Sequence, residues 1–458
     1  MLIRFIAENF LSFDEPTEFN MLSGANANSK RPIYEYNKDI KLLNLAAIYG
    51  ANGSGKSNLV KGLITMQLYI IGTEYGKRFL ILPFYLKESR HLDPSNFKDP
   101  IKLKVEILHE GKILFYELHH SNNVVVYERL DLVKAYGEDD VIFERTRKDG
   151  VNHLTFNKRY TETEKQKAFI EVYSEVLKTQ AFANLDLPGL PEEVLALRKW
   201  FQQLIIINSD SVNLDLIHSI QNKPELKDFV ASNIKKWVQG IEGLETGWIK
   251  LEDYLGENEK ERKDKIIDAV EKGERPFDLA RGFPVGFGKN QNGDIGAFII
   301  TTFHKDNANG KVPFSPPMES AGTNRLIDIL PLVFFALHTS NVVVIDEIDQ
   351  SLHPILTKQL LKMYVESIHD PVKGQLIFTT HEANLLDLDL LRKDEIWFTE
   401  KNEKGATEMY PLSDFKVRSD LDIQKGYLQG RFGAIPFLGN LDDLSWNKES
   451  NSGEGQKV

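Results

Sequence analysis

An eight-residue, glycine-rich stretch carries the clearest chemical signal in the sequence. Gly50-Ala51-Asn52-Gly53-Ser54-Gly55-Lys56-Ser57 fits the pattern GxxxxGK[ST] and lies between an apolar run, LNLAAIY, and a segment with helical spacing, SNLVKGLI. A strand, this loop and a helix in that order form a phosphate-binding loop, because the glycines let backbone N–H groups surround the phosphates. The N-terminus of the helix adds partial positive charge. We therefore expect a nucleoside triphosphate to be bound by Gly50, Asn52, Gly53, Ser54, Gly55, Lys56, Ser57 and Asn58.

Two acidic residues after an apolar run supply the second half of such a site. The run 342–345, VVVI, predicts a buried strand, and Asp346 and Glu347 follow it. Open α/β sheets bind ligands at the carboxyl ends of their strands. Lys56 would then reach the β- and γ-phosphates, Ser57 and Asp346 would hold Mg²⁺, and Glu347 would polarise the attacking water. Neighbouring carboxylates often only end a strand, but a phosphate loop on the same chain favours ATP and Mg²⁺ as cofactors.

The segments that must position these residues begin with a strand-rich part. In residues 1–157, LIRFIAENF and LLNLAAIYG predict strands, and SNLVKGLITMQLYIIG predicts a helix. IKLKVEILHEGKILFYELHH predicts two strands joined by a turn at Glu110-Gly111, and NVVVYERLDLV predicts another. We expect these residues to form the N-terminal half of an α/β nucleotide-binding unit.

Residues 158–280 change to helical periodicity. Four segments have this spacing, and Pro191 and Pro224 stand near the first turn of two of them: TETEKQKAFIEVYSEVLK, PEEVLALRKWFQQLIII, PELKDFVASNIKKWVQGIEGL and EKERKDKIIDAVEKG. We expect a helical insertion. Its basic stretches, Lys235-Lys236 and Lys260–Lys265, are interpreted as a solvated helix face, with a surface that senses a partner or trigger as the alternative.

Residues 281–440 alternate strand and helix patterns and predict the C-terminal half of the unit. The order is DIGAFIITTFH, NRLIDILPLVFFALH, NVVVIDE, HPILTKQLLKMYVESIH and GQLIFTTH. Such alternation indicates a parallel sheet with covering helices. Residues 441–458 are polar and are predicted to be a disordered tail.

Composition limits the classes of function. The 458 residues carry a net charge of −11 and no cysteine, which excludes disulfides, thiolate-bound zinc and a cysteine nucleophile. Proteins that coat nucleic acid by charge alone are usually basic, although a local basic patch stays possible. The longest apolar runs, such as Ile329–Leu337, are shorter than the roughly 18 residues of a membrane span. The N-terminus, MLIRFIAENFLSF, lacks a signal-peptide cleavage pattern. We expect a cytoplasmic protein with no membrane partner.

The second half of the chain resembles an ATP-binding-cassette ATPase. VVVIDEIDQSLHP followed by QLIFTTH is similar to the Walker B motif, the D-loop (residues 349–353) and a strand that ends in a switch histidine, here His381. Residues 319–323, ESAGT, resemble the signature motif. The resemblance implies a P-loop cassette fold with a mixed sheet, an antiparallel strand subdomain and a helical insertion. It also implies a head-to-tail dimer or a larger ring, with His381 at the γ-phosphate and with Ser320 and Gly322 binding the partner's ATP.

Several of these residues have a purely structural alternative. His381 could be a structural histidine, and Ser320 could simply cap a helix. Arg325 could assist the partner's site, or it could be an ordinary solvated arginine. The family's glutamine loop has no clear equivalent, because Gln67 follows the phosphate loop too soon and residues 82–86 contain no glutamine.

A wider set of motifs resembles bacterial stand-alone ATPases of abortive-infection and anti-phage systems. The set is NFLSF, GANGSGKSNL, ESAGTNRL, DEIDQSLHP, TTHEANLLD and GRFGAIPFLG. Similar proteins include relatives of the overcoming-lysogenisation-defect ATPase, Rlo- and Abi-type proteins and the ATPase half of the PARIS system. The opening FIAENFLSFDE resembles SMC- and RecF-like cassettes, although Leu11 stands where many of these carry a basic residue.

The resemblance implies a regulatory ATPase that assembles with ATP and controls a separately encoded effector, a nuclease, in response to DNA or a phage protein. The chain has no nuclease pattern of its own, since Asp139-Asp140, Asp387 and Asp389 are interpreted as loop charges. A RecF- or SMC-like DNA repair ATPase that binds duplex DNA is the alternative, although the insertion is too short for SMC arms. A non-catalytic ATP switch is a third possibility, and Glu347 argues against it.

Overall fold

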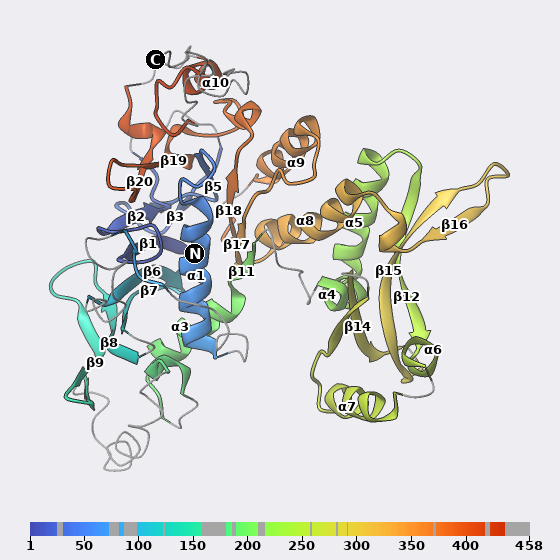
Figure 1. Cartoon of the computed structure of the whole chain (residues 1–458), viewed down its shortest axis with the longest axis horizontal. Helices are drawn as coiled ribbons and strands as arrows, with labels where there is room; N and C mark the ends of the chain where they lie inside the picture. The colour runs from blue at the N-terminus through green and yellow to red at the C-terminus, as the bar shows by residue number, and fades with distance from the viewer. Residues whose placement is uncertain are drawn as a thin grey trace, which may run out of the picture.

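The structure of the protein, a computed structural model, forms two lobes (Figure 1). One lobe consists mainly of residues up to 208 and after 342, and the other consists mainly of residues 216–314. The predicted helix over 161–178 and the predicted tail over 441–458 lie outside the described residues. The structure describes residues 1–24, 31–72, 82–86, 99–121, 124–157, 180–185, 189–208, 216–256, 259–280, 283–290, 292–369, 372–416 and 422–435.

The sheet that carries the phosphate loop has the strand order β11-β17-β18-β5-β19-β20. Neighbouring strands from β11 to β19 are parallel, and β20 runs antiparallel to β19. β5, β17 and β18 are buried along their whole length, so they read as largely apolar runs in the sequence. The strands are β5 (Leu45–Gly50), β11 (Ile205–Ile207), β17 (Val342–Ile345), β18 (Gln375–Thr380), β19 (Ile396–Lys401) and β20 (Thr407–Pro411).

Helices cover both faces of this sheet. α1 (Lys56–Ile71) and α3 (Glu192–Gln203) share one hydrophobic cluster with Ala46 and Ile48 of β5. The opposite cluster contains Leu45 and Ala47 together with α8 (Ala321–His338), α9 (Pro354–Ser367) and α10 (Ile423–Leu428). Successive side chains of a strand point to opposite faces, so a one-residue slip of β5 would exchange its two sets of partners. Burial of both faces therefore fixes the register of the strand that leads into the phosphate loop.

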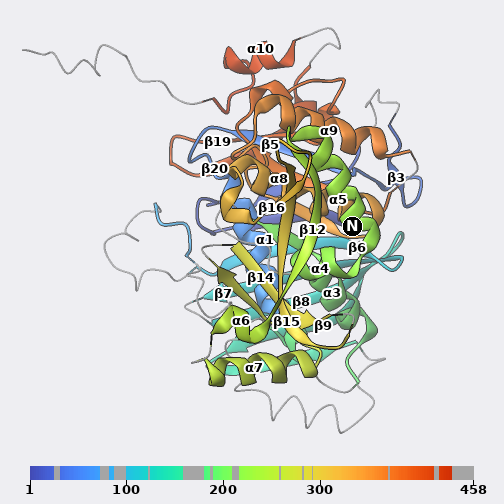
Figure 2. The same cartoon turned by 90° about the vertical axis from the view of Figure 1, so that its right-hand side faces the viewer.

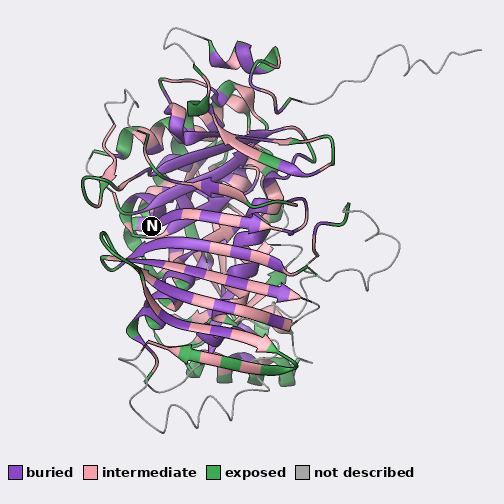
Figure 3. Cartoon of the chain, turned by 90° about the vertical axis from the view of Figure 1, so that its left-hand side faces the viewer, coloured by how far each residue is buried: buried purple, intermediate pink, exposed green. Residues whose placement is uncertain are grey.

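A second, antiparallel sheet packs against the other side of α1. Its order is β10-β9-β8-β7-β6-β1-β2. Buried and half-buried residues alternate along much of this sheet, whereas exposed and half-buried residues alternate along its edge strand β10 (Figure 3). The predicted turn at Glu110-Gly111 is confirmed, with φ of 49° and 80°. Gln375 of β18 links the two sheets by accepting from Leu2 N at 2.5 Å and donating to Leu2 O at 3.0 Å. The strands are β1 (Leu2–Glu8), β2 (Thr17–Asn20), β6 (Ile101–His109), β7 (Lys112–Ser121), β8 (Val124–Val133), β9 (Asp140–Lys148) and β10 (Val151–Phe156).

The second lobe is a mixed α/β unit. A sheet of order β12-β15-β14-β13, with β16 paired to β15, is packed against helices, as Figure 2 shows. The helices are α4 (Leu216–Asn222), α5 (Pro224–Trp237), α6 (Leu251–Leu255) and α7 (Lys260–Glu271). The strands are β12 (Ile241–Lys250), β13 (Phe277–Ala280), β14 (Phe283–Lys289), β15 (Ile295–Lys305) and β16 (Lys311–Phe314).

The insertion predicted as helical over residues 158–280 therefore contains strands as well as the helices α3 to α7. The helix predicted to continue to residue 244 ends at Trp237, and Gly240 follows with φ of 93°. β12 then pairs with β15 along its length, so long-range pairing decides the conformation of this stretch. The helix predicted over 191–207 ends at Gln203, because β-branched Ile205–Ile207 pair with β17 instead.

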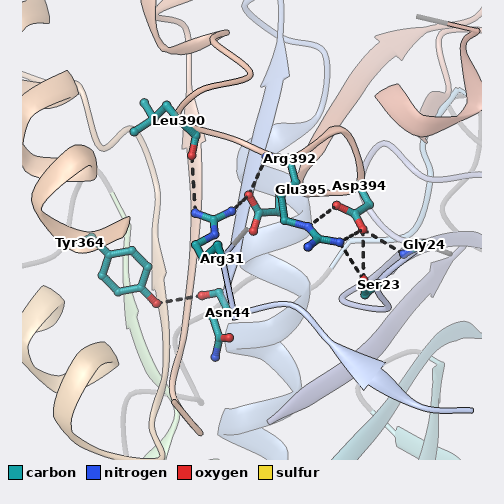
Figure 4. A network of polar contacts seen from close by, with 9 residues as sticks. All are labelled: Ser23, Gly24, Arg31, Asn44, Tyr364, Leu390, Arg392, Asp394 and Glu395. Atoms are coloured by element: carbon teal, nitrogen blue, oxygen red, sulfur yellow. Dashed lines mark hydrogen bonds and ion pairs between the residues drawn. The ribbon is translucent and has the colours of Figure 1, made fainter. Parts of the chain in front are cut away.

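Short elements and a polar network connect the N-terminal residues to the end of the core sheet (Figure 4). Arg31 forms an ion pair with Glu395, and Glu395 also accepts from Arg392 N at 2.8 Å. Arg392 binds both carboxylate oxygens of Asp394 and donates to Ser23 Oγ at 2.8 Å. The short elements are β3 (Tyr34–Glu35), β4 (Lys41–Leu42), and 3₁₀ turns at Phe182–Asn184, Pro316–Met318, Ala383–Leu385, Lys393–Glu395 and Leu412–Asp414.

Removing one member of this network should cost far more than breaking a surface pair. The Arg31 and Glu395 side chains are 9% and 2% exposed, so Arg31→Met would leave a buried carboxylate without its cation. We expect a loss of about 3–5 kcal/mol in unfolding free energy, measured by urea denaturation. Lys41→Met, which breaks an exposed pair with Glu35, is the matched control and should cost less than about 1 kcal/mol. Equal losses would show that the network contributes no more than the surface pair.

Candidate nucleotide site

Three neighbouring parallel strands end at one edge of the core sheet and bring the predicted site residues together. β18 lies between β17 and β5, with Phe378 opposite Ile345 and Thr380 opposite Tyr49. The residues that follow these strands, at the start of the phosphate loop, at Asp346 and at His381, therefore lie side by side. This edge is the place where parallel sheets bind ligands, and Figure 1 shows the three strands next to one another.

At two positions the phosphate loop has a backbone conformation that favours glycine. Gly53 and Gly55 have φ of 75° and 115°, and Gly55 directly precedes α1. A side chain at Gly50 or Gly55 would also collide with the hydroxyl of Thr399 or Thr407, respectively. Gly53 and Asn52 are exposed, and no atom lies within 4 Å of a Cβ built at Gly53. The loop is closely backed on one side and open on the side where phosphates would bind.

A set of hydroxyl groups supports the loop from behind. Ser54 Oγ lies 2.7 Å from Thr399 Oγ1, and Thr407 Oγ1 donates to Ser54 O at 2.7 Å. Ser12 Oγ accepts from Asn58 Nδ2 at 2.8 Å and lies 2.8 Å from Thr407 Oγ1, which can accept the hydrogen of the Ser12 hydroxyl. Asn58 therefore links the start of α1 to the N-terminal strand region, and its contact with a nucleotide stays a prediction. Sequence reasoning did not find Ser12, Thr399 or Thr407, because they come from segments far apart in the chain.

Lys56 lies at the centre of the site with a buried side chain, which is only 4% exposed. Its Nζ donates to Gly50 O at 2.8 Å and Ala51 O at 3.1 Å, and it lies 3.3 Å from His381 Nδ1. Burial lowers the pKa of Lys56 to about 8, while the charges of Asp346 and Glu347 act in the opposite direction. Two loop carbonyls thus hold the ammonium group at the phosphate loop, where it could bind a triphosphate.

Thr379 fixes the acidic pair. Its Oγ1 donates to Asp346 Oδ1 at 2.5 Å and accepts from Glu347 N at 2.8 Å, and Thr379 itself is fully buried. Asp346 is 2% exposed, whereas Glu347 is half-buried. One hydroxyl therefore orients the Asp346 carboxylate and the peptide that carries Glu347. The other carboxylate oxygen of Asp346, Oδ2, does not accept a hydrogen bond from Thr379.

His381 lies between the phosphate loop and the acidic pair. Its Nε2 is 3.8 Å from Glu347 Oε1, and its Nδ1 faces Lys56. Burial and the neighbouring Lys56 charge lower its pKa below the ordinary value, with Asp349 and Glu347 opposing the shift. The lowered pKa favours a neutral imidazole, in which one ring nitrogen accepts a hydrogen bond and the other donates one.

The magnesium assignment agrees with the donor set. No group of three or more His, Asp or Glu residues among the described residues could hold a metal on its own. Mg²⁺ at triphosphate sites takes only one or two protein oxygens and completes its shell with phosphate oxygens and water. Asp346 offers such an oxygen, and Ser57, the second predicted ligand, is half-buried in the first turn of α1. When bound, the ion would neutralise phosphate charge.

The predicted signature residues lie at the start of α8. Ser320 is the N-cap and accepts from Thr323 N at 3.1 Å. Within one chain, Ser320 therefore acts as a helix cap, which is the structural alternative. Gly322 approaches the D-loop, since a Cβ there would lie 3.0 Å from Ser351 O. Arg325 Nη2 donates to the carbonyls of Asp346 and Glu347 at 3.3 and 2.9 Å. Contact of Ser320 and Gly322 with a partner's nucleotide stays a prediction.

The structure places Gln67 away from the site. Gln67 Nε2 donates to Phe201 O at 2.8 Å and Leu204 O at 2.7 Å, so it closes the end of α3. Asn208 follows β11, whose Ile207 pairs with Ile345, so Asn208 stands in line with Asp346.

Comparison with known proteins gives one family match. The model described as "AAA domain, putative AbiEii toxin, Type IV TA system" matches residues 184–387. No curated protein matches the chain. The match covers β17, Asp346 and Glu347 and, with the phosphate loop between β5 and α1, it agrees with the predicted fold class. The chain has an α/β fold with a mixed sheet, a phosphate-loop pattern between β5 and α1, and an antiparallel subdomain.

Solved structures that are similar to the chain include three SMC heads. The SMC head domain from Thermotoga maritima is 13% identical over 90% of this chain and 98% of that chain, with a TM-score of 0.33. An SMC head bound to the C-winged helix domain of ScpA is 12% identical over 90% and 97%, with a TM-score of 0.40. An SMC head with an extended coiled coil, bound to the C-terminal domain of ScpA derived from Pyrococcus furiosus, is 14% identical over 94% and 98%, with a TM-score of 0.37.

Thr379→Val should weaken magnesium-dependent nucleotide binding, because it frees the Asp346 carboxylate and leaves Glu347 N without its acceptor. We expect affinity for ATP in the presence of Mg²⁺ to fall about 10–100-fold, measured by titration with a fluorescent ATP analogue. Thr380→Val is the matched control, since this fully buried neighbour only accepts from Glu382 N at 3.0 Å. Equal losses in both variants would contradict the role assigned to Thr379.

Proposed function

We propose that the chain binds MgATP between residues 50–57 and the Asp346–Glu347 pair and hydrolyses it. The observation that supports this most directly is the convergence of Lys56, Asp346, Glu347 and His381 at the ends of three adjacent strands. Backbone amides at 50–57 and Lys56 would hold the phosphates. Glu347 would accept a hydrogen bond from the attacking water and orient it toward the γ-phosphate. Neutral His381, beside both groups, would hold the γ-phosphate or the water in place.

Assembly through the signature segment is the second part of the proposal. Ser320 is exposed, and two large apolar side chains near this region are also exposed, Met318 at 57% and Ile355 at 74%. Met318 precedes the signature residues, and Ile355 follows the D-loop. A second copy of the chain, placed head to tail, would cover these side chains and bring Ser320 and Gly322 to its ATP.

We further propose that this ATPase regulates a separately encoded effector in an abortive-infection type of defence. The support is the motif set of the sequence and the matched family model, whose description refers to an AbiEii toxin and a Type IV TA system. A nuclease is the proposed effector, and DNA or a phage protein is the proposed trigger. No helix among the described residues is long and apolar enough to cross a membrane. Co-purification with the product of a neighbouring gene tests the partnership, and ATP-stimulated, salt-dependent DNA binding by the chain alone would favour the repair alternative.

Glu347→Gln should abolish turnover while ATP stays bound, because the amide cannot take up the proton of the attacking water. We expect ATPase activity to fall by at least about 100-fold and the mass of the particle with ATP, measured by light scattering, to exceed that of the parent. Glu382→Gln is the matched control, since Glu382 follows His381 but caps a 3₁₀ turn. Unchanged turnover in Glu347→Gln would remove Glu347 from the mechanism.

ATP binding should take up protons at alkaline pH. With burial holding the pKa of Lys56 at about 8, half of the free protein lacks this charge at that pH. A bound triphosphate favours the charged form, so the pKa rises on binding and affinity falls as pH increases above 8. The fall should approach about tenfold per pH unit.

Calorimetry in buffers of different ionisation enthalpy measures this proton uptake directly. Lys61→Gln, an exposed position on the same helix, should keep the parent's pH profile. An affinity that is constant between pH 7 and 9.5 would contradict the assignment of Lys56 to the phosphates.

A further inference from the structure

The first turn of α8 touches the segment after β17 at two separate points. Arg325 donates from one nitrogen, Nη2, to the carbonyls of Asp346 and Glu347. Three residues earlier, Gly322 lies against the carbonyl of Ser351, so closely that a Cβ would lie 3.0 Å from it. The same short helical turn thus contacts both ends of the segment 346–351, which carries the proposed water-orienting residue.

This segment has a backbone that must be held in place. Glu347 and Ser351 have φ of 53° and 61°, in the left-handed region that residues with a Cβ rarely adopt. Such conformations persist only when the surrounding structure fixes them. Thr379 fixes one side, since it accepts from Glu347 N. Arg325 is the group that binds the carbonyls on the other side.

Arg325 does not behave as a solvated helix arginine. Its Nη2 donates to the two carbonyls. Its Nε is buried and has no hydrogen-bond partner, so this arrangement leaves one N–H group unsatisfied. Burial lowers its pKa, while the carboxylates of Asp328, Asp349 and Glu347 oppose that shift. A guanidinium placed here keeps its charge among these carboxylates, and its hydrogen bonds go to main-chain atoms.

We infer that Arg325 is a positioning residue that couples the signature turn of α8 to the orientation of Glu347. The inference rests on the proposed function, because it concerns the residue proposed to orient water. In a head-to-tail dimer, ATP of the partner would bind at Ser320 and Gly322, within the turn of helix that precedes Arg325. A shift of that turn would move the Arg325 hydrogen bonds and, through the Glu347 carbonyl, the carboxylate that faces the chain's own ATP.

The coupling can be tested with Arg325→Gln and two other variants. Arg325→Lys keeps the charge and a donor, so it should retain part of the function. Arg262→Gln removes an exposed arginine of α7, whose partner is Asp278, and is the matched control. Hydrogen exchange of residues 346–352 reports the position of the turn, because Ile348 N, Gln350 N and Leu352 N are all hydrogen-bonded there. ATP binding, kcat and KM are measured on the same proteins.

For Arg325→Gln we expect exchange in residues 346–352 to rise at least about tenfold and kcat to fall about 10–100-fold, while the Kd for ATP changes less than twofold. Arg325→Lys should fall between parent and Arg325→Gln, and Arg262→Gln should equal the parent. Unchanged exchange would overturn the inference, and so would exchange that rises equally over the whole chain. If the parent itself does not hydrolyse ATP, the proposed function fails, and the exchange of residues 346–352 alone decides whether Arg325 holds the turn.

Discussion

The register of β5, β18 and β17 is the constraint on which the candidate site depends. Thr380 pairs with Tyr49 and Phe378 pairs with Ile345, so β5 from the N-terminal part of the chain ends beside β17 and β18 from its C-terminal part. The register is fixed by burial of both sheet faces, since each strand contributes alternate side chains to two different hydrophobic clusters. Packing in the core thereby decides the distance between Lys56, His381 and Glu347, and none of these side chains sets it alone.

Hydrogen bonds from distant segments hold the phosphate loop and the turn at Glu347 in place at the strand ends. Ser12, Thr399 and Thr407 support the phosphate loop, while Thr379 and Arg325 hold the two sides of the turn at Glu347. The unfavourable backbone conformation at Glu347 is stable because these partners surround it. The same partners leave the open side of the loop, at exposed Asn52 and Gly53, to a ligand.

Much of this arrangement could be predicted from the sequence where the signal is local. The phosphate loop, the strand before Asp346, the strand before His381 and the turn at Glu110-Gly111 each follow from a few adjacent residues. β12 and β11 could not be predicted in this way, because their residues also fit a helix and only pairing with β15 and β17 decides between the two. The roles of Thr379 and Arg325 could not be predicted for a related reason. A buried threonine and a helix arginine gain their roles only when the fold brings them to the peptide at Asp346–Glu347.

The measurement that tests the central claim most directly is a structure of the protein with Mg²⁺ and a non-hydrolysable ATP analogue. The account predicts phosphates surrounded by the amides of residues 50–57, with Lys56 turned from the loop carbonyls to the β- and γ-phosphates. Mg²⁺ should lie at Ser57 and on the side of Asp346, and the γ-phosphate should face Glu347 and His381. A nucleotide bound elsewhere, or none at saturating concentration, would contradict the account.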